Sequence, residues 1–305
     1  MALPNLIIAG APKCGTSSLF QWIADHPDAE GSIVKETCYF VDAGSHVFDP
    51  ANNFSSGGQA GYERFFPVSN RKAKIRLEAT PTYLYQESAL RLLPDLPNRP
   101  RFLFVLREPS AQILSTYRYF TNNWTHLKAG VSFADFLEMA DRKDPRLAHN
   151  ELLRLAHANA RYIDPLSRWR ERVGEARMKV ILLEDIQADR NAAMADLAAW
   201  LGLDPDFYAD YPYPRENETY RVRSRMAQAI NQQVRGLVAR TPFYQPARAL
   251  YRRLNTAKAP APLSASDHAA LAALRRAYAA DNARLAALFD LDLTSWSHEA
   301  ALACP

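Results

Sequence analysis

Short apolar runs alternate along the chain with segments in which apolar residues recur at helical spacing. An unbroken apolar run is typical of a strand that is buried on both faces, as the strands of a parallel sheet are. Such runs lie at 5–9, 102–106 and 180–183, with a weaker one at 74–78. Strands that alternate with helices predict a three-layer α/β fold, in which a mostly parallel sheet is flanked by helices.

Apolar residues recur at helical spacing after the strongest apolar runs and again near the end of the chain. The pattern predicts a helix over 16–25, and Pro109 stands in the first turn of another, where proline is tolerated. Apolar positions at helical spacing predict a C-terminal helix over 267–289. Residues 43–70 are rich in Gly, Ser and Asn, which predicts a long irregular loop of the kind that carries function.

Composition and net charge exclude several classes of protein. The chain has 305 residues, of which 48% are hydrophobic and 23% are charged, as in a globular protein, and we interpret 1–305 as a single domain. The 37 Lys and Arg residues exceed the 33 Asp and Glu residues only slightly, giving a net charge of +4. This excess is too small to predict nucleic-acid binding without a local basic patch.

Cysteines and apolar stretches bear on the compartment. Cys14, Cys38 and Cys304 are odd in number and stand at no metal-ligand spacing, so the sequence predicts neither a disulfide framework nor a zinc site. The apolar start lacks a basic leader and runs into Gly10 and Pro12, which favours a strand over a signal peptide. No later stretch reaches the roughly 20 apolar residues of a membrane-spanning helix. We therefore expect a cytoplasmic protein without a transmembrane segment.

One region of the chain is strongly asymmetric in charge. No acidic residue stands between Glu218 and Asp267, while nine basic residues do. We interpret 221–255 as a basic helical segment. Together with Lys258, this segment either forms a solvated face or meets an anionic membrane surface, an acidic carrier protein or a polyanionic substrate.

The turn after the first predicted strand, residues 10–17 (GAPKCGTS), leads directly into the first predicted helix. Backbone N–H groups and the positive end of the helix dipole bind anions at such a junction, which predicts a phosphate site. The loop of nucleoside triphosphatases has the pattern G-x-x-x-x-G-K-[ST], but here Thr16 takes the place of its lysine and Lys13 lies inside the loop. Cys14 is either a small packed residue or a thiol of lowered pKa.

The run at 102–106 leads to a second candidate phosphate site. It ends in Arg107, where magnesium-dependent phosphoryl transfer usually needs an aspartate. Together with Ser115 in the following helix, Arg107 can bind phosphate through charge-assisted and hydroxyl hydrogen bonds. The alternative is an ion pair of Arg107 with Glu108 or Asp185. Two phosphate sites without a metal ligand indicate a nucleotide with two separate phosphate groups.

These motifs resemble those of a known family. Residues 12–17 (PKCGTS) are similar to the 5′-phosphosulfate loop of sulfotransferases that use 3′-phosphoadenosine 5′-phosphosulfate (PAPS), and residues 107–115 are similar to their 3′-phosphate motif. Residues 35–40 (KETCYF) and 78–83 (EATPTY) resemble the K-E-x-H-[FY]-F and E-K-T-P-x-Y segments of the heparan-sulfate-type branch, which includes N-deacetylase/N-sulfotransferases, 3-O-sulfotransferases and bacterial relatives. The motifs stand in family order over about 5–225.

The resemblance implies a fold like that of the P-loop nucleotide kinases, PAPS as the donor, adenosine 3′,5′-bisphosphate (PAP) as the product, and no metal requirement. The motifs assign Arg107 and Ser115 to the 3′-phosphate, and Arg221 and Arg223 to a basic loop that closes over the nucleotide. The residues assigned to the 5′ end of the nucleotide are Lys13, Cys14, Gly15, Thr16, Ser17 and Ser18.

Sulfuryl transfer needs a cation on the leaving side and a base on the acceptor side. Negative charge develops on the bridging oxygen of the leaving nucleotide, and a lysine there stabilises the transition state more than the ground state, which makes Lys13 the candidate. The resemblance makes Glu36 the general base for an acceptor hydroxyl or amine. The alternative is that Glu36 forms an exposed ion pair with Lys35.

Two departures from the family pattern leave the acceptor open among carbohydrates, lipids and small molecules. Ala79 and Cys38 stand where the heparan-sulfate-type branch has lysine and histidine. Two other functions also fit the sequence. One is a P-loop kinase-like phosphotransferase, and the other is a catalytically inactive nucleotide-binding protein.

Overall fold

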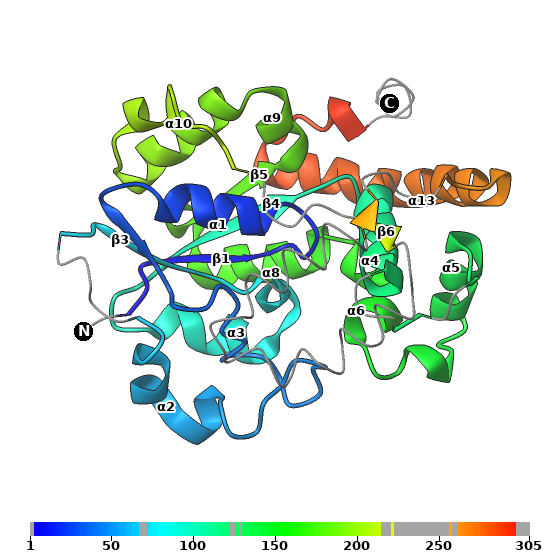
Figure 1. Cartoon of the computed structure of the whole chain (residues 1–305), viewed down its shortest axis with the longest axis horizontal. Coiled ribbons are helices and arrows are strands. Elements are labelled where there is room, and N and C mark those ends of the chain that lie inside the picture. Colours follow the sequence, from blue (N-terminus) through cyan, green and yellow to red (C-terminus); the bar gives the residue numbers. More distant parts are fainter. Residues whose placement is uncertain are drawn as a thin grey trace.

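The computed structural model contains a five-stranded sheet in which all strands run parallel (Figure 1). The structure describes residues 3–66, 72–122, 126–127, 130–214, 221–222, 256–257 and 262–296. The strand order is β2-β3-β1-β4-β5, which confirms the predicted parallel sheet. The strands are β1 (Leu6–Gly10), β2 (Ala29–Gly31), β3 (Ile75–Ala79), β4 (Arg101–Leu106) and β5 (Met178–Leu182).

The centre of the sheet is built from the two most apolar runs. All of β1 and all of β4 except its first residue are buried, because their side chains are apolar on both faces. β1 lies between β3 and β4, with Ile8 opposite Ala79 on one side and Leu103 on the other. The four predicted strands are confirmed to within two residues at each end. β2 was not predicted, because its three residues, AEG, form no apolar run.

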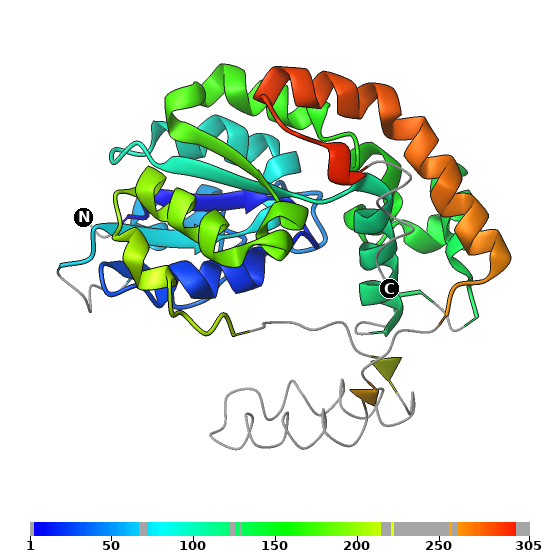
Figure 2. The same cartoon turned by 90° about the horizontal axis from the view of Figure 1, so that it is seen from above.

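Helices cover both faces of the sheet. In Figures 1 and 2, α1 and α10 lie on one face, and α3 and α8 lie on the other, which confirms the three-layer arrangement. The Trp169 ring of α8 packs on β4, with its centroid 4.9 Å from that of Phe102. The α-helices are α1 (Thr16–Ala24), α2 (Phe54–Glu63), α3 (Glu87–Leu92), α4 (Pro109–Asn122), α5 (Phe133–Asp141), α6 (Glu151–Arg154), α7 (Ala156–Asn159), α8 (Ile163–Val173), α9 (Leu183–Ala188), α10 (Arg190–Leu201) and α13 (Ala265–Phe289). The 3-10 helices are η1 (Pro81–Tyr85), η2 (Leu93–Asp95), η3 (Pro145–Leu147), η4 (Glu175–Arg177), η5 (Pro205–Tyr208) and η6 (Thr294–Trp296).

A second hydrophobic cluster lies beside the sheet and joins α4, α5 and α13. The rings of Tyr117 in α4 and Phe136 in α5 stack with centroids 5.6 Å apart. Asp267 ties α13 to α5, because its Oδ1 accepts the backbone N–H of Ala134 at 3.0 Å. The predicted C-terminal helix is confirmed, and Ser264 caps it two residues earlier than expected. α13 passes α4 and α5 on its way to α8 (Figure 2).

The prediction of an irregular loop over 43–70 is wrong for α2. Asn53 caps this helix, because its side chain accepts the backbone N–H of Ser56 while the Ser56 hydroxyl reaches back to the cap. Tyr62 anchors the last turn in the hydrophobic core. Tertiary packing and the cap therefore outweigh the low helix propensity of the glycine-rich sequence.

The helix predicted to begin at 221 does not begin there. Arg221–Val222 form strand β6, which pairs antiparallel with β7 (Thr256–Ala257). Pairing between segments so far apart in the chain leaves no local periodic signal. The rest of the basic segment up to 258, including Arg223, lies outside the described residues.

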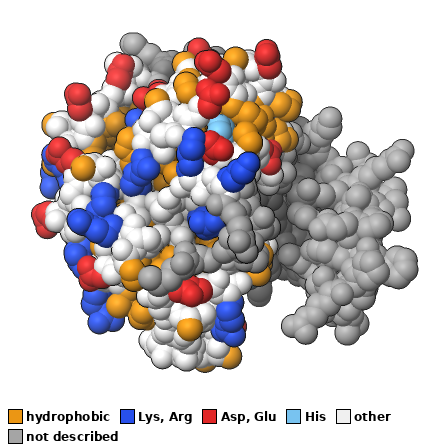
Figure 3. All heavy atoms as spheres, turned by 90° about the vertical axis from the view of Figure 1, so that its left-hand side faces the viewer, with side chains coloured by type: hydrophobic (Ala, Val, Ile, Leu, Met, Phe, Trp, Pro, Cys, Tyr) orange, Lys and Arg blue, Asp and Glu red, His pale blue; other side chains and the backbone are white. Residues whose placement is uncertain are grey.

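Acidic and basic side chains share the face of the molecule drawn in Figure 3, in keeping with the net charge of +4. Neither sign forms a continuous field across the coloured part of this face. In the described ranges, no helix is both long enough and apolar enough to cross a membrane.

Candidate active site

A cavity of about 880 Å³ lies at the edge of the sheet where the strands end. Its lining includes one residue that follows each strand: Pro12 after β1, Lys35 after β2, Pro81 after β3, Arg107 after β4 and Leu183 after β5. Parallel strands end at the same edge of a sheet, so the connections that leave them converge there. The fold thus brings together motifs that are far apart in the sequence.

The loop between β1 and α1 lines this cavity with Pro12, Lys13 and Gly15. Its first residue is fixed to β4, because the Ala11 N–H donates to the Val105 carbonyl at 2.8 Å. Gly15 ends the loop with φ 84°, a left-handed conformation that favours glycine, and no side chain caps the first turn of α1. The N-cap residue itself thus provides no side-chain acceptor at the helix start, which is compatible with the predicted anion site.

The side chain of Cys14 packs into the protein interior beneath the loop backbone, away from solvent. The thiol is fully buried, lies 3.6 Å from the Pro12 carbonyl and 3.9 Å from the Tyr162 hydroxyl, and does not line the cavity. Burial raises the pKa of the Cys14 thiol to about 12. The packed-residue interpretation is confirmed, and the alternative of a thiol with a lowered pKa is wrong. Only the backbone of Cys14 can take part in the predicted nucleotide binding.

Lys13 is the cation of the loop. Its Nζ lies 3.6 Å from the centroid of the Tyr119 ring, so the ammonium rests on an aromatic face. Burial lowers the pKa of Lys13 to about 8, Glu36 opposes this change, and the charge of Arg107 adds to it. The predicted donor and acceptor residues are therefore close enough to act on one another electrostatically.

Arg107 and Ser115 line the same cavity as Lys13. The alternative ion pair of Arg107 with Glu108 or Asp185 does not form among the described residues. The Glu108 carboxylate instead caps α4 by accepting the backbone N–H groups of Ser110 at 2.9 Å and Ala111 at 2.8 Å. The guanidinium of Arg107 is thus left for a ligand, in agreement with a phosphate-binding role.

Glu36 lies at the cavity wall and also forms the ion pair considered as its alternative role. Its Oε1 accepts from Lys35 Nζ at 2.6 Å, and its side chain is 53% exposed. An exposed pair of this kind contributes at most about 1 kcal/mol to stability. The pair therefore leaves Glu36 free to exchange its partner when an acceptor enters.

Glu78 holds the segment that carries Glu36, and sequence reasoning gave it no role. Its carboxylate is fully buried in β3 and accepts hydroxyl hydrogen bonds from Thr37 and Thr80 at 2.6 Å each and a short one from Tyr62. Burial raises the pKa of Glu78, and these hydrogen bonds oppose the change. One buried carboxylate thus ties the residue next to Glu36 to the sheet and to α2.

Tyr83 extends this network to the following backbone. Because the Thr37 hydroxyl donates to Glu78, the Tyr83 hydroxyl donates to Thr37 across 3.1 Å. The same Tyr83 oxygen accepts the backbone N–H of Tyr39 at 3.0 Å. Cys38 lies between these residues with φ 50° and lines the cavity. Burial, followed by the charge of Glu36, raises the pKa of its thiol to about 12.

The structure brings most of the predicted site residues together and adds others. Lys13, Gly15, Thr16, Ser17 and Ser18 all line the cavity, as do Arg107, Ser115 and Glu36. The side chains of Arg221 and Arg223 lie outside the described residues. Other wall residues were not predicted from the sequence: Trp22, His46, Val47, Thr82, Tyr119, Phe120, His126, Leu152, Ile186, Gln187 and Arg190.

Two of the missed residues had a signal in the sequence. Tyr119 stands four positions after Ser115 in one helix, and residues at that spacing share a helix face. His46 lies in the 43–70 segment, whose composition indicated a functional loop. Throughout the described ranges, no group of three or more His, Cys, Asp or Glu side chains is arranged to hold a metal ion.

Known proteins with similar sequences are sulfotransferases. The chain is 28% identical over 179 residues to the membrane-associated sulfotransferase kil1 of Dictyostelium discoideum, a match that covers 58% of this chain and 32% of that protein. It is 21% identical over 206 residues to the bifunctional heparan sulfate N-deacetylase/N-sulfotransferase 4 of Mus musculus, covering 67% and 23% of the two chains. The chain thus spans less than a third of the length of these relatives. No protein-family model matches it.

A solved structure resembles the chain over nearly its whole length. It is a sulfotransferase from Alicyclobacillus acidocaldarius, with a TM-score of 0.67 and 22% sequence identity over 97% of this chain and 99% of that one. The chain has the sulfotransferase fold. The sequence similarity to heparan sulfate N-sulfotransferases and 3-O-sulfotransferases confirms the predicted resemblance. In this sulfotransferase fold, the 10–17 turn and Arg107 leave the neighbouring strands β1 and β4.

Proposed function

We propose that this protein is a sulfotransferase that moves a sulfuryl group from PAPS to a hydroxyl or amine of a carbohydrate, lipid or small-molecule acceptor. The observation that carries the proposal is that two cationic sites, the Lys13 loop and Arg107 with Ser115, line one cavity. They follow neighbouring strands, which in a sheet lie about 4.8 Å apart. The names of the similar proteins support the same activity.

The residues of the cavity fit a nucleotide with two separate phosphate groups. The uncapped first turn of α1 offers backbone N–H groups, and Arg107 offers a guanidinium without a protein partner in the described part of the chain. When bound, PAPS supplies the sulfuryl group. Lys13 stabilises the negative charge that develops on the leaving side, and Glu36 takes the proton of the acceptor.

Calorimetry with nucleotides tests the donor site. PAP is expected to bind without magnesium and more tightly than ATP with magnesium. Arg107→Gln should reduce the preference for PAP over adenosine 5′-monophosphate, because it removes the charge assigned to the 3′-phosphate. Arg142→Gln, on an exposed part of the chain, is the matched control. Tighter binding of magnesium ATP than of PAP would instead favour the kinase-like phosphotransferase.

Transfer of labelled sulfate tests the chemistry. With an acceptor found by following PAP release, Glu36→Gln should lower kcat by about 10²- to 10⁴-fold, the usual contribution of a general base. PAP affinity should stay nearly unchanged at pH 6.5, where Lys13 is protonated. Glu138→Gln on the exposed side of α5 is the control. Wild-type turnover in Glu36→Gln would remove Glu36 from this role. PAP binding without transfer to any acceptor would favour the inactive nucleotide-binding protein.

A further inference from the structure

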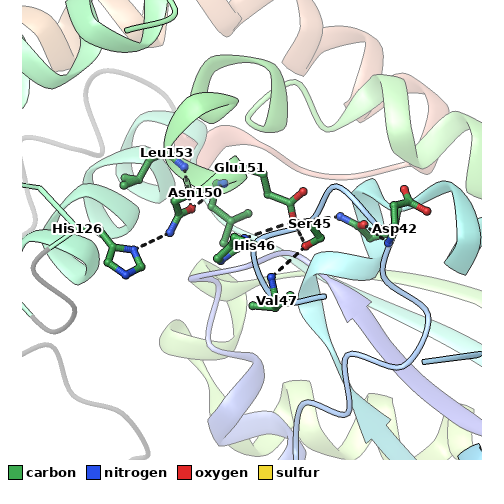
Figure 4. Close-up of polar contacts among 10 residues, drawn as sticks. Asp42, Ser45, His46, Val47, His126, Asn150, Glu151 and Leu153 are labelled. Atoms are coloured by element: carbon green, nitrogen blue, oxygen red, sulfur yellow. Dashed lines mark hydrogen bonds and ion pairs between the residues drawn. The ribbon is translucent and has the colours of Figure 1, made fainter. Parts of the chain in front are cut away.

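The short helix α6 holds two histidines at the wall of the cavity. His46 and His126 both line the cavity, although they come from separate segments of the chain. Asn150, the cap of α6, accepts the backbone N–H of Leu152 at 3.0 Å through Oδ1, so its Nδ2 faces the Nδ1 of His126, 3.0 Å away (Figure 4). The start of α6 thus serves the cavity as well as its own helix.

Glu151, the first residue of α6, faces His46 in the same way. Its Oε1 lies 3.6 Å from the His46 Nδ1, a buried atom with no hydrogen-bond partner among the described residues (Figure 4). This separation is longer than a full hydrogen bond, so the contact is mainly electrostatic. The same oxygen accepts from the Ser45 hydroxyl at 2.6 Å and from the Gln86 amide at 3.2 Å.

These contacts bear on which ring nitrogen of His46 carries the proton. Burial raises the pKa of Glu151, but the interactions with His46 and Ser45 outweigh it, and the net result is a lowered pKa. An ionised carboxylate beside Nδ1 favours the tautomer with the proton on that nitrogen. The opposite nitrogen, Nε2, then carries a lone pair and has no hydrogen bond to the described part of the chain.

His46 is connected to the reacting end of the cavity by a row of aromatic rings. Lys13 rests on Tyr119, whose ring centroid is 5.1 Å from that of Phe120. The Phe120 ring centroid is in turn 6.2 Å from that of His46. The imidazole therefore lies two rings away from the residue assigned to the leaving group, within the same cavity.

We propose that His46 binds the acceptor, with its Nε2 accepting a hydrogen bond from a hydroxyl or amine N–H of that molecule, and that Glu151 is the positioning residue that fixes the tautomer. The inference rests on the proposed sulfotransferase function, because it concerns the acceptor half of the same cavity. It requires an acceptor with a hydrogen-bond donor in contact with His46.

Binding of three probe alcohols to the full chain saturated with PAP tests this inference. The probes are glucosamine, 2-naphthol and 1-octanol, which represent a sugar, a small aromatic molecule and a lipid chain. At least one should bind, and His46→Ala should weaken that binding about fivefold to tenfold, the effect of one lost hydrogen bond. His46→Gln should restore most of the affinity, because its side-chain carbonyl also accepts. His268→Ala, an exposed histidine of α13, is the matched control.

Nitrogen-15 NMR of the imidazoles separates a positioning role from a merely structural one. The wild-type protein should show His46 with a proton on Nδ1 and none on Nε2, and the bound probe should shift the Nε2 signal. Glu151→Gln should lose this tautomer preference and weaken probe binding, with PAP affinity unchanged. Equal probe affinity in wild type and His46→Ala, or no probe binding to a protein that binds PAP, would overturn the inference. Failure to bind PAP at all would instead remove the proposed function, and the inference with it.

Discussion

Proton-linked binding of PAP follows from the environment of Lys13. Burial lowers the pKa of Lys13 to about 8 in the free protein, so the side chain is about half protonated at pH 8 and about one-tenth protonated at pH 9. A bound phosphate or sulfate group favours the ammonium form and raises the pKa again. The added binding energy is therefore fully present well below pH 8 and is lost as the pH rises from 8 to the raised pKa of the bound state. Affinity should fall by nearly tenfold per pH unit above pH 8.

Calorimetric titration with PAP in buffers of different ionisation enthalpy measures this linkage. At pH 8, Lys13 should contribute an uptake of about half a proton, and at pH 6.5, where it is already protonated, this contribution should be almost absent. Lys13→Arg should abolish the uptake, because a guanidinium stays charged at both pH values. Lys74→Arg, an exposed lysine paired with Asp28, should leave it unchanged. If wild type and Lys13→Arg took up the same number of protons at pH 8, the assignment of Lys13 to the anion site would be refuted.

Two further substitutions test the supports of the site. Thr37→Val should lower the free energy of unfolding, measured in urea, by about 2 kcal/mol, because Glu78 loses a buried hydrogen-bond donor. Thr82→Val is the control and should change it little, because the buried Thr82 hydroxyl has no partner in the described residues. Equal losses in the two variants would contradict this account. Gly15→Ala should weaken PAP binding at least tenfold in calorimetry, because φ is 84° and an added Cβ would crowd α9. Gly130→Ala is the control and should bind PAP normally, because Gly130 also has a positive φ, 91°, but has open space around it. Normal binding by Gly15→Ala would exclude a specific role for this turn.

The sequence predicted the centre of the sheet and the edge strand β5, but not the edge strand β2. β1 and β4 were predictable because strands buried on both faces need apolar runs, and the residues after them gave the donor loop and Arg107. β2 was not predictable, because its three residues, AEG, form no apolar run and only their pairing with β3 marks them as a strand. The cytoplasmic location stays a prediction from composition.

The acceptor side was less predictable because its contacts join distant segments. The donors to Glu78 come from Thr37, Tyr62 and Thr80, and no local pattern relates these positions. His46 is held by Glu151 from a helix that begins after α4 and α5 in the chain. Motifs could assign residues to the nucleotide, whereas the acceptor wall is assembled by tertiary packing.

The buried carboxylate of Glu78 anchors one of the two segments that line the cavity with candidate catalytic residues. The segment that presents Glu36 is anchored through Glu78 and Tyr83, whereas the turn that presents Lys13 is anchored through Ala11 to β4. Because the two anchors share no hydrogen bond among the described residues, we expect exchange of the 41–48 stretch to change acceptor binding more than PAP binding.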